Sequence, residues 1–252
     1  MAETHSLAAA LEALAEPPPG VEQEIAAGDE MFTTGRRDLY FQLGAAALRA
    51  VRLALLTAGK GAPARILDFP CGHGRVLRML KAEFPDAALA AGDLNADGVA
   101  FCARRFGATP IESSLRAEEV AIEGRFDLVW CGSLLTHLDR DRWPGFFSLL
   151  VGAVDRGGVL VFTAYGRDRA ERIRSRTALH GIGEHGARKI LGEYDRDGFG
   201  YADYEGQELS GMSLTSPAWV CDRIAAESSL RLVSYTESGW HGQQDVIAVS
   251  RT

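Results

Sequence analysis

The sequence predicts an α/β fold in which a mostly parallel sheet is covered by helices on both faces. Apolar runs of strand length alternate with segments of helical periodicity from about residue 64 onward, which is the order that repeated β-α-β units produce. A strand, a glycine turn and a helix open this series. Near its end, two strand-like runs are joined by the short link 237–244. Such a link cannot hold a helical crossover, so we expect the last two strands to pair antiparallel.

The first unit is the most informative part of the chain. The stretch 66–74 reads ILDFPCGHG, in which a buried strand ends at Asp68 and a turn follows with Gly72 and Gly74. Glycines allow a tight turn and leave room for a ligand near the backbone. Residues 75–83 carry their apolar side chains at helical spacing. This unit predicts a site for a cofactor that contains a nucleoside.

Two classes of cofactor use such a unit, and the sequence separates them. A dinucleotide fingerprint needs a third small residue where Leu77 stands, which disfavours a nicotinamide-dependent oxidoreductase. The next strand ends at Asp93, whose carboxylate suits the two hydroxyls of a ribose, and Leu94 beside it can cover an adenine face. Adenosine is therefore the expected part of the cofactor.

The remaining elements follow in the order that a doubly wound sheet requires. A helix is expected over 97–106, a third strand over 108–112 with a polar turn at Ser113 and Ser114, a fourth strand over 126–131, a helix over 142–154 and a fifth strand over 159–163. The fifth strand is wholly apolar, as expected for a strand covered on both faces. Ser216 and Pro217 are typical of a helix start. Strands over 230–236 and 245–250 then complete the sheet.

From about Ala64 to Ser250 these residues resemble the class I S-adenosylmethionine (SAM)-dependent methyltransferases, and Asp68, Gly72, Gly74 and Asp93 match the motifs of that family. The resemblance implies a Rossmann-like, doubly wound seven-stranded sheet in the order 3-2-1-4-5-7-6, with strand 7 antiparallel. It also implies SAM as the cofactor and methyl transfer as the activity. The chain departs from the usual glycine pattern at Pro70, whose ring fixes φ near about −65°.

The resemblance also assigns candidate cofactor-binding residues. The glycine loop is expected at the methionine end of SAM, the acid after the second strand at the ribose, the turn after the third strand at the adenine, and the end of the fourth strand beside the methyl group. The set comprises Asp68, Pro70, Cys71, Gly72, Gly74, Asp93, Leu94, Ser114, Cys131 and Ser133.

Two histidines are candidates for a general base that takes the proton of an acceptor hydroxyl. His137 follows the fourth strand, and the alternative is that it only shapes the cofactor pocket. His241 lies in the link between the last two strands, where Trp240 is expected to line the acceptor pocket or to cap the core. Tyr40 and His185 are further candidates for acceptor binding. Their alternatives are core packing and an inert surface position.

We divide the chain into an N-terminal helical extension over 1–60, which starts with an alanine-rich helix, and a methyltransferase domain over 61–252. Within the domain, segment 166–214 is long, polar and rich in tyrosine, with His180 among its residues. A segment of this kind is typical of a lid or binding element, or is partly disordered. We expect methyl transfer to a small molecule, at a hydroxyl of a sugar-containing or secondary metabolite. The alternative is a non-catalytic SAM-binding or S-adenosylhomocysteine-binding regulatory or partner protein.

Composition limits the partners and the compartment. A net charge of −7 and the lack of a clear basic stripe disfavour nucleic acid. No stretch is expected to span a bilayer, which needs ~20 apolar residues. The N-terminus has no basic leader, and the four cysteines are scattered, which suits a cytoplasmic protein and gives no metal-binding pattern. A homodimer through the N-terminal helices is left open.

Overall fold

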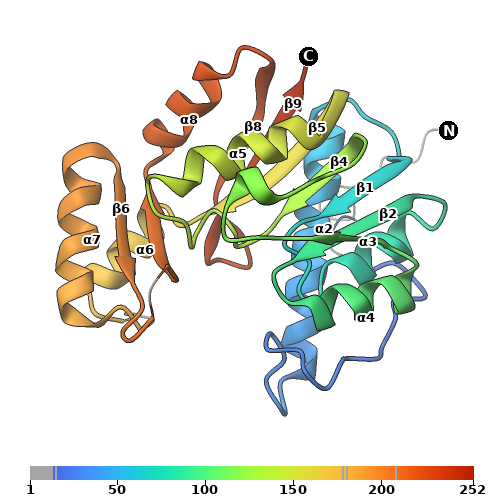
Figure 1. The fold of residues 1–252 in the computed structure, drawn as a ribbon, viewed down its shortest axis with the longest axis horizontal. Coiled ribbons are helices and arrows are strands. Elements are labelled where there is room, and N and C mark those ends of the chain that lie inside the picture. Colours follow the sequence, from blue (N-terminus) through green and yellow to red (C-terminus); the bar gives the residue numbers. More distant parts are fainter. Residues whose placement is uncertain (1–13, 15, 178, 180, 208) are drawn as a thin grey trace, which may run out of the picture.

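The central element of the computed structural model, which describes residues 14, 16–177, 179, 181–207 and 209–252, is a seven-stranded sheet (Figure 1). Its order is β3-β2-β1-β4-β5-β9-β8, and β9 runs antiparallel to both of its neighbours. This confirms the predicted order, with β8 and β9 as the sixth and seventh strands. The strands are β1 Arg65–Asp68, β2 Ala88–Asp93, β3 Thr109–Glu112, β4 Phe126–Cys131, β5 Val154–Ala164, β8 Leu230–Trp240 and β9 Gln244–Arg251.

Helices cover both faces of this sheet and bury two apolar cores. Because neighbouring strand residues point to opposite faces, Ile66 and Leu128 belong to one core while Leu67 and Val129 belong to the other. The first core is closed by α2 Arg37–Thr57, α3 Leu77–Glu83 and α4 Ala96–Phe106, and the second by α5 Arg142–Ala153 and α8 Pro217–Ala226. Every β-α step therefore brings the carboxyl end of a parallel strand to one edge of the sheet.

Local signals in the sequence account for most element boundaries. The Ser216 hydroxyl accepts a hydrogen bond from the amide of Trp219, and Pro217 opens α8, as predicted. Two boundaries were predicted wrongly: β5 begins at Val154 rather than at residue 159, and β8 continues to Trp240, which pairs with Gln244. The link between β8 and β9 is therefore only residues 241–243.

The segment predicted as a variable lid is an ordered unit of its own. It contains α6 Arg167–Arg174, α7 Gly183–Asp197, β6 Phe199–Asp203 and β7 Gly211–Thr215, with β6 and β7 paired in a separate two-stranded sheet. Ile173, Ile190 and Met212 belong to an apolar cluster of this segment. We call residues 167–215 the inserted unit; it extends to one side of the central sheet (Figure 1). His180 lies outside the described residues.

The N-terminal part contributes one long helix to the core. Ala47, Leu48, Val51 and Ala54 of α2 are buried in the first core. By length and composition alone, α2 could cross a membrane, and 44% of its most apolar window is buried inside the protein. The expectation that no stretch reaches this length was therefore wrong, although a core helix passes the same test. The predicted alanine-rich helix falls within residues 1–13, outside the described residues.

Candidate cofactor and acceptor site

The glycine turn after β1 is held in place by the end of β2 and the start of α4. Gly72 has a φ of +51°, and its amide donates a hydrogen bond to Asp93 Oδ2 at 2.7 Å. The amide of Cys71 donates to the carbonyl of Gly92 at 2.9 Å. A Cβ on Gly98 of α4 would lie 2.4 Å from the carbonyl oxygen of Gly72. Close packing therefore fixes the turn, with Gly72 facing open space.

Gly74 has a different role from the one predicted. It lies at φ +78°, and a Cβ there would stand 2.4 Å from the ring of Phe106 and 3.1 Å from the sulfur of Cys102. It does not line the pocket described next. Its place in the cofactor-binding set is corrected to close packing of the turn against α4.

A pocket of about 330 Å³ opens at the carboxyl ends of β1, β2 and β4, where open α/β sheets bind ligands. The N-terminal segment before α2 also contributes to its wall, through Asp29, Glu30 and Met31. The sequence did not single out these three residues. Ten of the predicted site residues line the pocket: Asp68, Pro70, Cys71, Gly72, Asp93, Leu94, Ser114, Ser133, His137 and Trp240.

The Asp68 carboxyl is the most unusual group in this pocket. It is buried, and neither of its oxygens has a hydrogen-bond partner among the described residues. Burial and the negative charge of Asp93 hold its pKa well above the usual range, while Arg75 opposes them in part. The backbone N–H of Leu77 also lowers this pKa in part. A buried polar group without a partner is costly, so Asp68 is suited to a donor that arrives with a ligand.

Arg75 supplies the opposite charge on the same wall and was missed in the sequence. Its Nε is buried without a hydrogen-bond partner among the described residues, and its guanidinium lies 5.6 Å from the ring centre of Trp240. Burial lowers its pKa, and the nearby Asp68 acts in the other direction. A carboxyl and a guanidinium in one pocket fit the ammonium and carboxylate of an amino acid, as the methionine part of SAM provides. A basic residue directly after a glycine turn was the available signal.

Asp93 lies where a ribose can reach it. Besides the bond from Gly72, its Oδ1 accepts one from the amide of Asn95 at 2.9 Å. Each carboxylate oxygen can accept a further hydrogen bond, and the partly exposed side chain lines the pocket. Leu94 and Ser114 line the same region. These residues fit the adenosine part of SAM.

The loop after β4, residues 132–141, forms the wall nearest to the inserted unit. Ser133 has a φ of +64°, which is uncommon for a residue with a side chain, and its amide donates to Thr163 Oγ1 at 2.8 Å. His137 Nδ1 lies 2.8 Å from the carbonyl oxygen of Gly211 and 3.0 Å from Tyr204 Oη. Burial lowers the pKa of His137, while the Gly211 contact raises it in part. The imidazole is thus held neutral beside the pocket.

Two predicted residues lie in the protein core instead of the pocket. Cys131 is buried in the second core, since Trp130 and Gly132 on either side of it take the pocket positions. Tyr40 is also buried, and its hydroxyl donates to Asp29 Oδ2 at 2.6 Å. Tyr40 therefore orients the carboxylate of Asp29 but does not itself line the acceptor site.

The other two corrections concern histidines. His241 follows Trp240 in the β8–β9 turn and lines a separate pocket against α2, while Trp240 lines the cofactor pocket. Neighbouring residues of a strand end point in opposite directions, which separates the pair. His185 is exposed on α7 and does not line the pocket. Neither is placed to take a proton or to bind an acceptor there.

Comparisons with known proteins identify a methyltransferase domain in part of the chain. Residues 66–158 match the family model of a methyltransferase domain. No curated protein matches the chain in sequence. Within the described part of the chain, no group of three or more His, Cys, Asp or Glu side chains could hold a metal ion.

Solved structures share the fold at low sequence identity. The 1,6-didemethyltoxoflavin-N1-methyltransferase of Burkholderia thailandensis, solved with 1,6-didemethyltoxoflavin and S-adenosylhomocysteine, is 17% identical with a TM-score of 0.57, over 86% of this chain and 82% of that one. The magnesium protoporphyrin IX methyltransferase of Synechocystis, with bound S-adenosylhomocysteine, is 11% identical with a TM-score of 0.55, over 88% and 90%.

A third structure is longer than this chain. An O-methyltransferase family protein of B. thailandensis is 13% identical with a TM-score of 0.52, over 87% of this chain but only 61% of that chain. The present chain thus spans about three fifths of the length of that protein. The match of residues 66–158 to a methyltransferase domain, the sheet order and the pocket are consistent with the class I SAM-dependent methyltransferases.

Proposed function

We propose that this protein transfers the methyl group of SAM to a hydroxyl of a small molecule, a sugar-containing or secondary metabolite, with His137 as the general base. The observation that carries the proposal is the place of His137, which lines the same pocket as Asp68 and Asp93, the residues that we propose to bind SAM. A pocket of about 330 Å³ is of the size that small-molecule sites have.

Bound SAM supplies an electrophilic methyl group on a positively charged sulfur. The work left to the protein is to hold the acceptor in line with that group, which contributes up to ~7–11 kcal/mol to catalysis. Asp68 and Arg75 would hold the methionine end of SAM and Asp93 its ribose. His137 Nε2 would take the proton of the acceptor hydroxyl, to which bound SAM would supply the methyl group. A base at this position contributes about 10²- to 10⁴-fold in rate.

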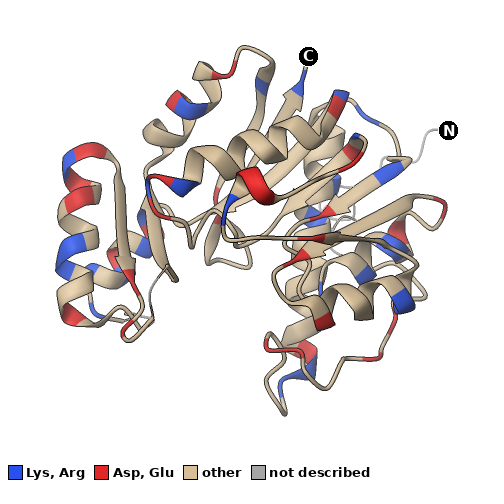
Figure 2. Ribbon diagram, in the orientation of Figure 1, with Lys and Arg blue, Asp and Glu red and all other residues tan. Residues whose placement is uncertain are grey.

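The proposal also covers the partners. Helix α6 carries several arginines, among them Arg172 and Arg174. Acidic groups accompany them, since Arg172 pairs with Asp168 at 2.6 Å and Arg174 pairs with Asp195, which supports a small-molecule acceptor rather than nucleic acid. Basic and acidic residues are interspersed along α6 and α7 (Figure 2). We further propose a cytoplasmic protein that acts without a membrane. A homodimer stays an open expectation.

The test is a matched pair of variants, His137→Asn and His241→Asn. S-adenosylhomocysteine is titrated by calorimetry, and transfer of labelled methyl from SAM to a metabolite extract is then measured. We expect both variants to bind S-adenosylhomocysteine as the wild type does. Labelling falls about 10²- to 10⁴-fold in His137→Asn and stays at the wild-type level in His241→Asn.

Three outcomes would count against the proposal. Equal labelling by both variants would remove His137 from the reaction. Binding of S-adenosylhomocysteine without transfer to any component of the extract would favour the non-catalytic alternative. Labelled product in which the methyl group sits on nitrogen or carbon would reject the hydroxyl acceptor.

A further inference from the structure

The histidine of the β4 loop is held by residues from a distant part of the chain. His137 lies in the loop after β4 of the central sheet, whereas its two polar neighbours, Tyr204 and Gly211, belong to the inserted unit. The rings of His137 and Tyr204 are 6.0 Å apart, and the ring of Tyr165 meets His137 edge-on at 6.5 Å. The inserted unit thus contacts the imidazole through its Nδ1 atom.

These contacts determine which ring nitrogen carries the proton. A backbone carbonyl can only accept, so at 2.8 Å from Gly211 O the Nδ1 of His137 must be the donor. Tyr204 Oη, at 3.0 Å, is then a second acceptor of the same N–H. In the neutral imidazole, Nε2 is left with the lone pair. Nε2 forms no hydrogen bond within the described part of the chain, and the ring lines the pocket.

Other hydrogen bonds fasten the inserted unit to the same loop. The Ser213 amide donates to the carbonyl of Thr136 at 2.8 Å, and its hydroxyl donates to the carbonyl of Leu135 at 2.8 Å. Both accepting residues directly precede His137. Two residues of β7, Gly211 and Ser213, therefore form hydrogen bonds to this loop. Together they fix the position of the imidazole.

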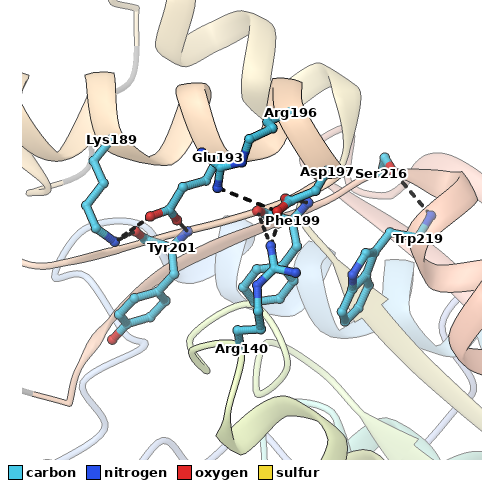
Figure 3. A network of polar contacts seen from close by, with 9 residues as sticks. All are labelled: Arg140, Lys189, Glu193, Arg196, Asp197, Phe199, Tyr201, Ser216 and Trp219. Carbon is cyan, nitrogen blue, oxygen red and sulfur yellow. Dashed lines mark hydrogen bonds and ion pairs between the residues drawn. The ribbon is translucent and has the colours of Figure 1, made fainter.

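Arg140 provides a second attachment on the other side of His137. Its Nη2 donates to Asp197 Oδ1 at 2.7 Å and to the carbonyl of Phe199 at 2.9 Å, and its guanidinium lies 4.8 Å from the ring centre of Phe199. Figure 3 shows Arg140 reaching up from the loop to the end of α7 and the start of β6, beside the Lys189–Glu193–Tyr201 contacts. The loop is attached to the inserted unit before and after the histidine.

We infer that the inserted unit positions the base of the reaction. The Gly211 carbonyl selects the Nδ1–H tautomer of His137. Tyr204 is a positioning residue that accepts a hydrogen bond from the same N–H when the ring becomes protonated. The base role of His137 rests on the proposed function, whereas the tautomer and the contacts do not. Both acceptors stabilise the protonated ring, so they increase the basicity of Nε2 toward the pocket.

The charged and titratable groups around His137 are few. Tyr204 and Tyr165 face it from the inserted unit and the segment leading into it, and Arg169 stacks on Tyr165 at 4.2 Å. On its own side, Asp139 and Arg142 form an ion pair at 2.7 Å. Burial raises the pKa of Tyr204 to about 12, so its hydroxyl stays protonated at neutral pH.

The first experiment reads the tautomer directly. Protein labelled with ¹⁵N-histidine is studied by long-range ¹H–¹⁵N correlation, and the His137 signals are identified by their absence in His137→Asn. We expect neutral His137 with the proton on Nδ1, opposite to the preference of free histidine in water. A proton on Nε2 would overturn the inference whether or not the protein methylates any acceptor.

The second experiment compares Tyr204→Phe with Tyr201→Phe, the same change on the same hairpin. Tyr201 donates to Asp203 at 2.8 Å and does not bond His137. Loss of one hydrogen bond to the base predicts a kcat about 3- to 10-fold lower for Tyr204→Phe, an unchanged KM for SAM, and an acidic limb of the pH–rate profile moved to lower pH. Tyr201→Phe keeps the wild-type values.

The outcomes separate the inference from the function. Equal losses of kcat in both tyrosine variants would show that the hairpin only needs its stability, and would overturn the role of Tyr204. An Nδ1–H tautomer in a protein that transfers no methyl group would sustain the positioning contacts and reject the proposed function.

Discussion

Replacing Asp68 by Asn is expected to stabilise the ligand-free protein and to weaken its binding of cofactor. The Asp68 carboxyl is buried with no hydrogen-bond partner among the described residues, and Asp93 adds like charge. Asparagine keeps the shape and removes the charge, so we expect the free energy of unfolding to rise by about 1–3 kcal/mol. For a chain of this length, each kcal/mol corresponds to a rise of about 2–4 °C in Tm.

The pH dependence of stability follows from the same group. A carboxyl whose pKa is higher in the folded than in the unfolded state binds more protons when folded. Its contribution to stability is therefore fully present below the unfolded pKa and is lost as pH rises through the raised value. Each unit by which the pKa is raised corresponds to about 1.4 kcal/mol. In Asp68→Asn, the free energy of unfolding should no longer fall as the pH rises from the unfolded-state pKa to the folded-state pKa of Asp68.

Binding of S-adenosylhomocysteine should change in the opposite direction. If Asp68 accepts a charged hydrogen bond from the ammonium of the ligand, its loss costs about 1.5–3 kcal/mol, which raises the Kd about 10- to 150-fold. Thermal unfolding across pH and calorimetry measure the two effects. The matched control is Asp86→Asn at an exposed position, which should leave both unchanged. A lower Tm together with an unchanged Kd in Asp68→Asn would refute this reasoning about the pocket.

Two further predictions concern the turn and the base. Gly74→Ala should lower the free energy of unfolding by about 1–3 kcal/mol in denaturant titrations, because its Cβ would stand 2.4 Å from Phe106 at a positive φ; a stability equal to that of the wild type would contradict the packing role. Burial lowers the pKa of His137 below 6.5, the ordinary value for histidine. We therefore expect activity to fall only when the pH drops below 6.5. A pH–rate profile with its acidic limb above 6.5 would contradict this.

The parts of the fold that the sequence predicted well are those set by neighbouring residues. The strand ending at Asp68, the glycine turn and the capped start of α8 depend on short-range periodicity and turn chemistry. Asp93 could be placed because parallel strands end at one edge of a sheet. Strand ends were less certain, since pairing of Trp240 with Gln244 depends on the partner strand.

The rest depended on tertiary contacts that no local pattern reports. Asp29 belongs to the pocket because α2 brings Tyr40 against it, and a segment rich in charge gave no sign of this. Similarly, Trp240 and His241 are adjacent in the chain but face different pockets. The inserted unit was underestimated because its polar composition hid a helix with Ile190 and Tyr194 on its buried side.

The site thus takes its two halves from different parts of the chain. Residues that fit the cofactor come from turns at the end of the central sheet, where close packing of glycines leaves little freedom. His137 follows β4 of the same sheet, but its ring is held by Gly211 and Tyr204 of the inserted unit. Arg140 attaches the His137 loop to that unit a second time. Since the energies of distant, independent sites add while those of sites in one network do not, changes at Asp68 should add to changes at Tyr204, whereas changes at Arg140 and Tyr204 should be coupled.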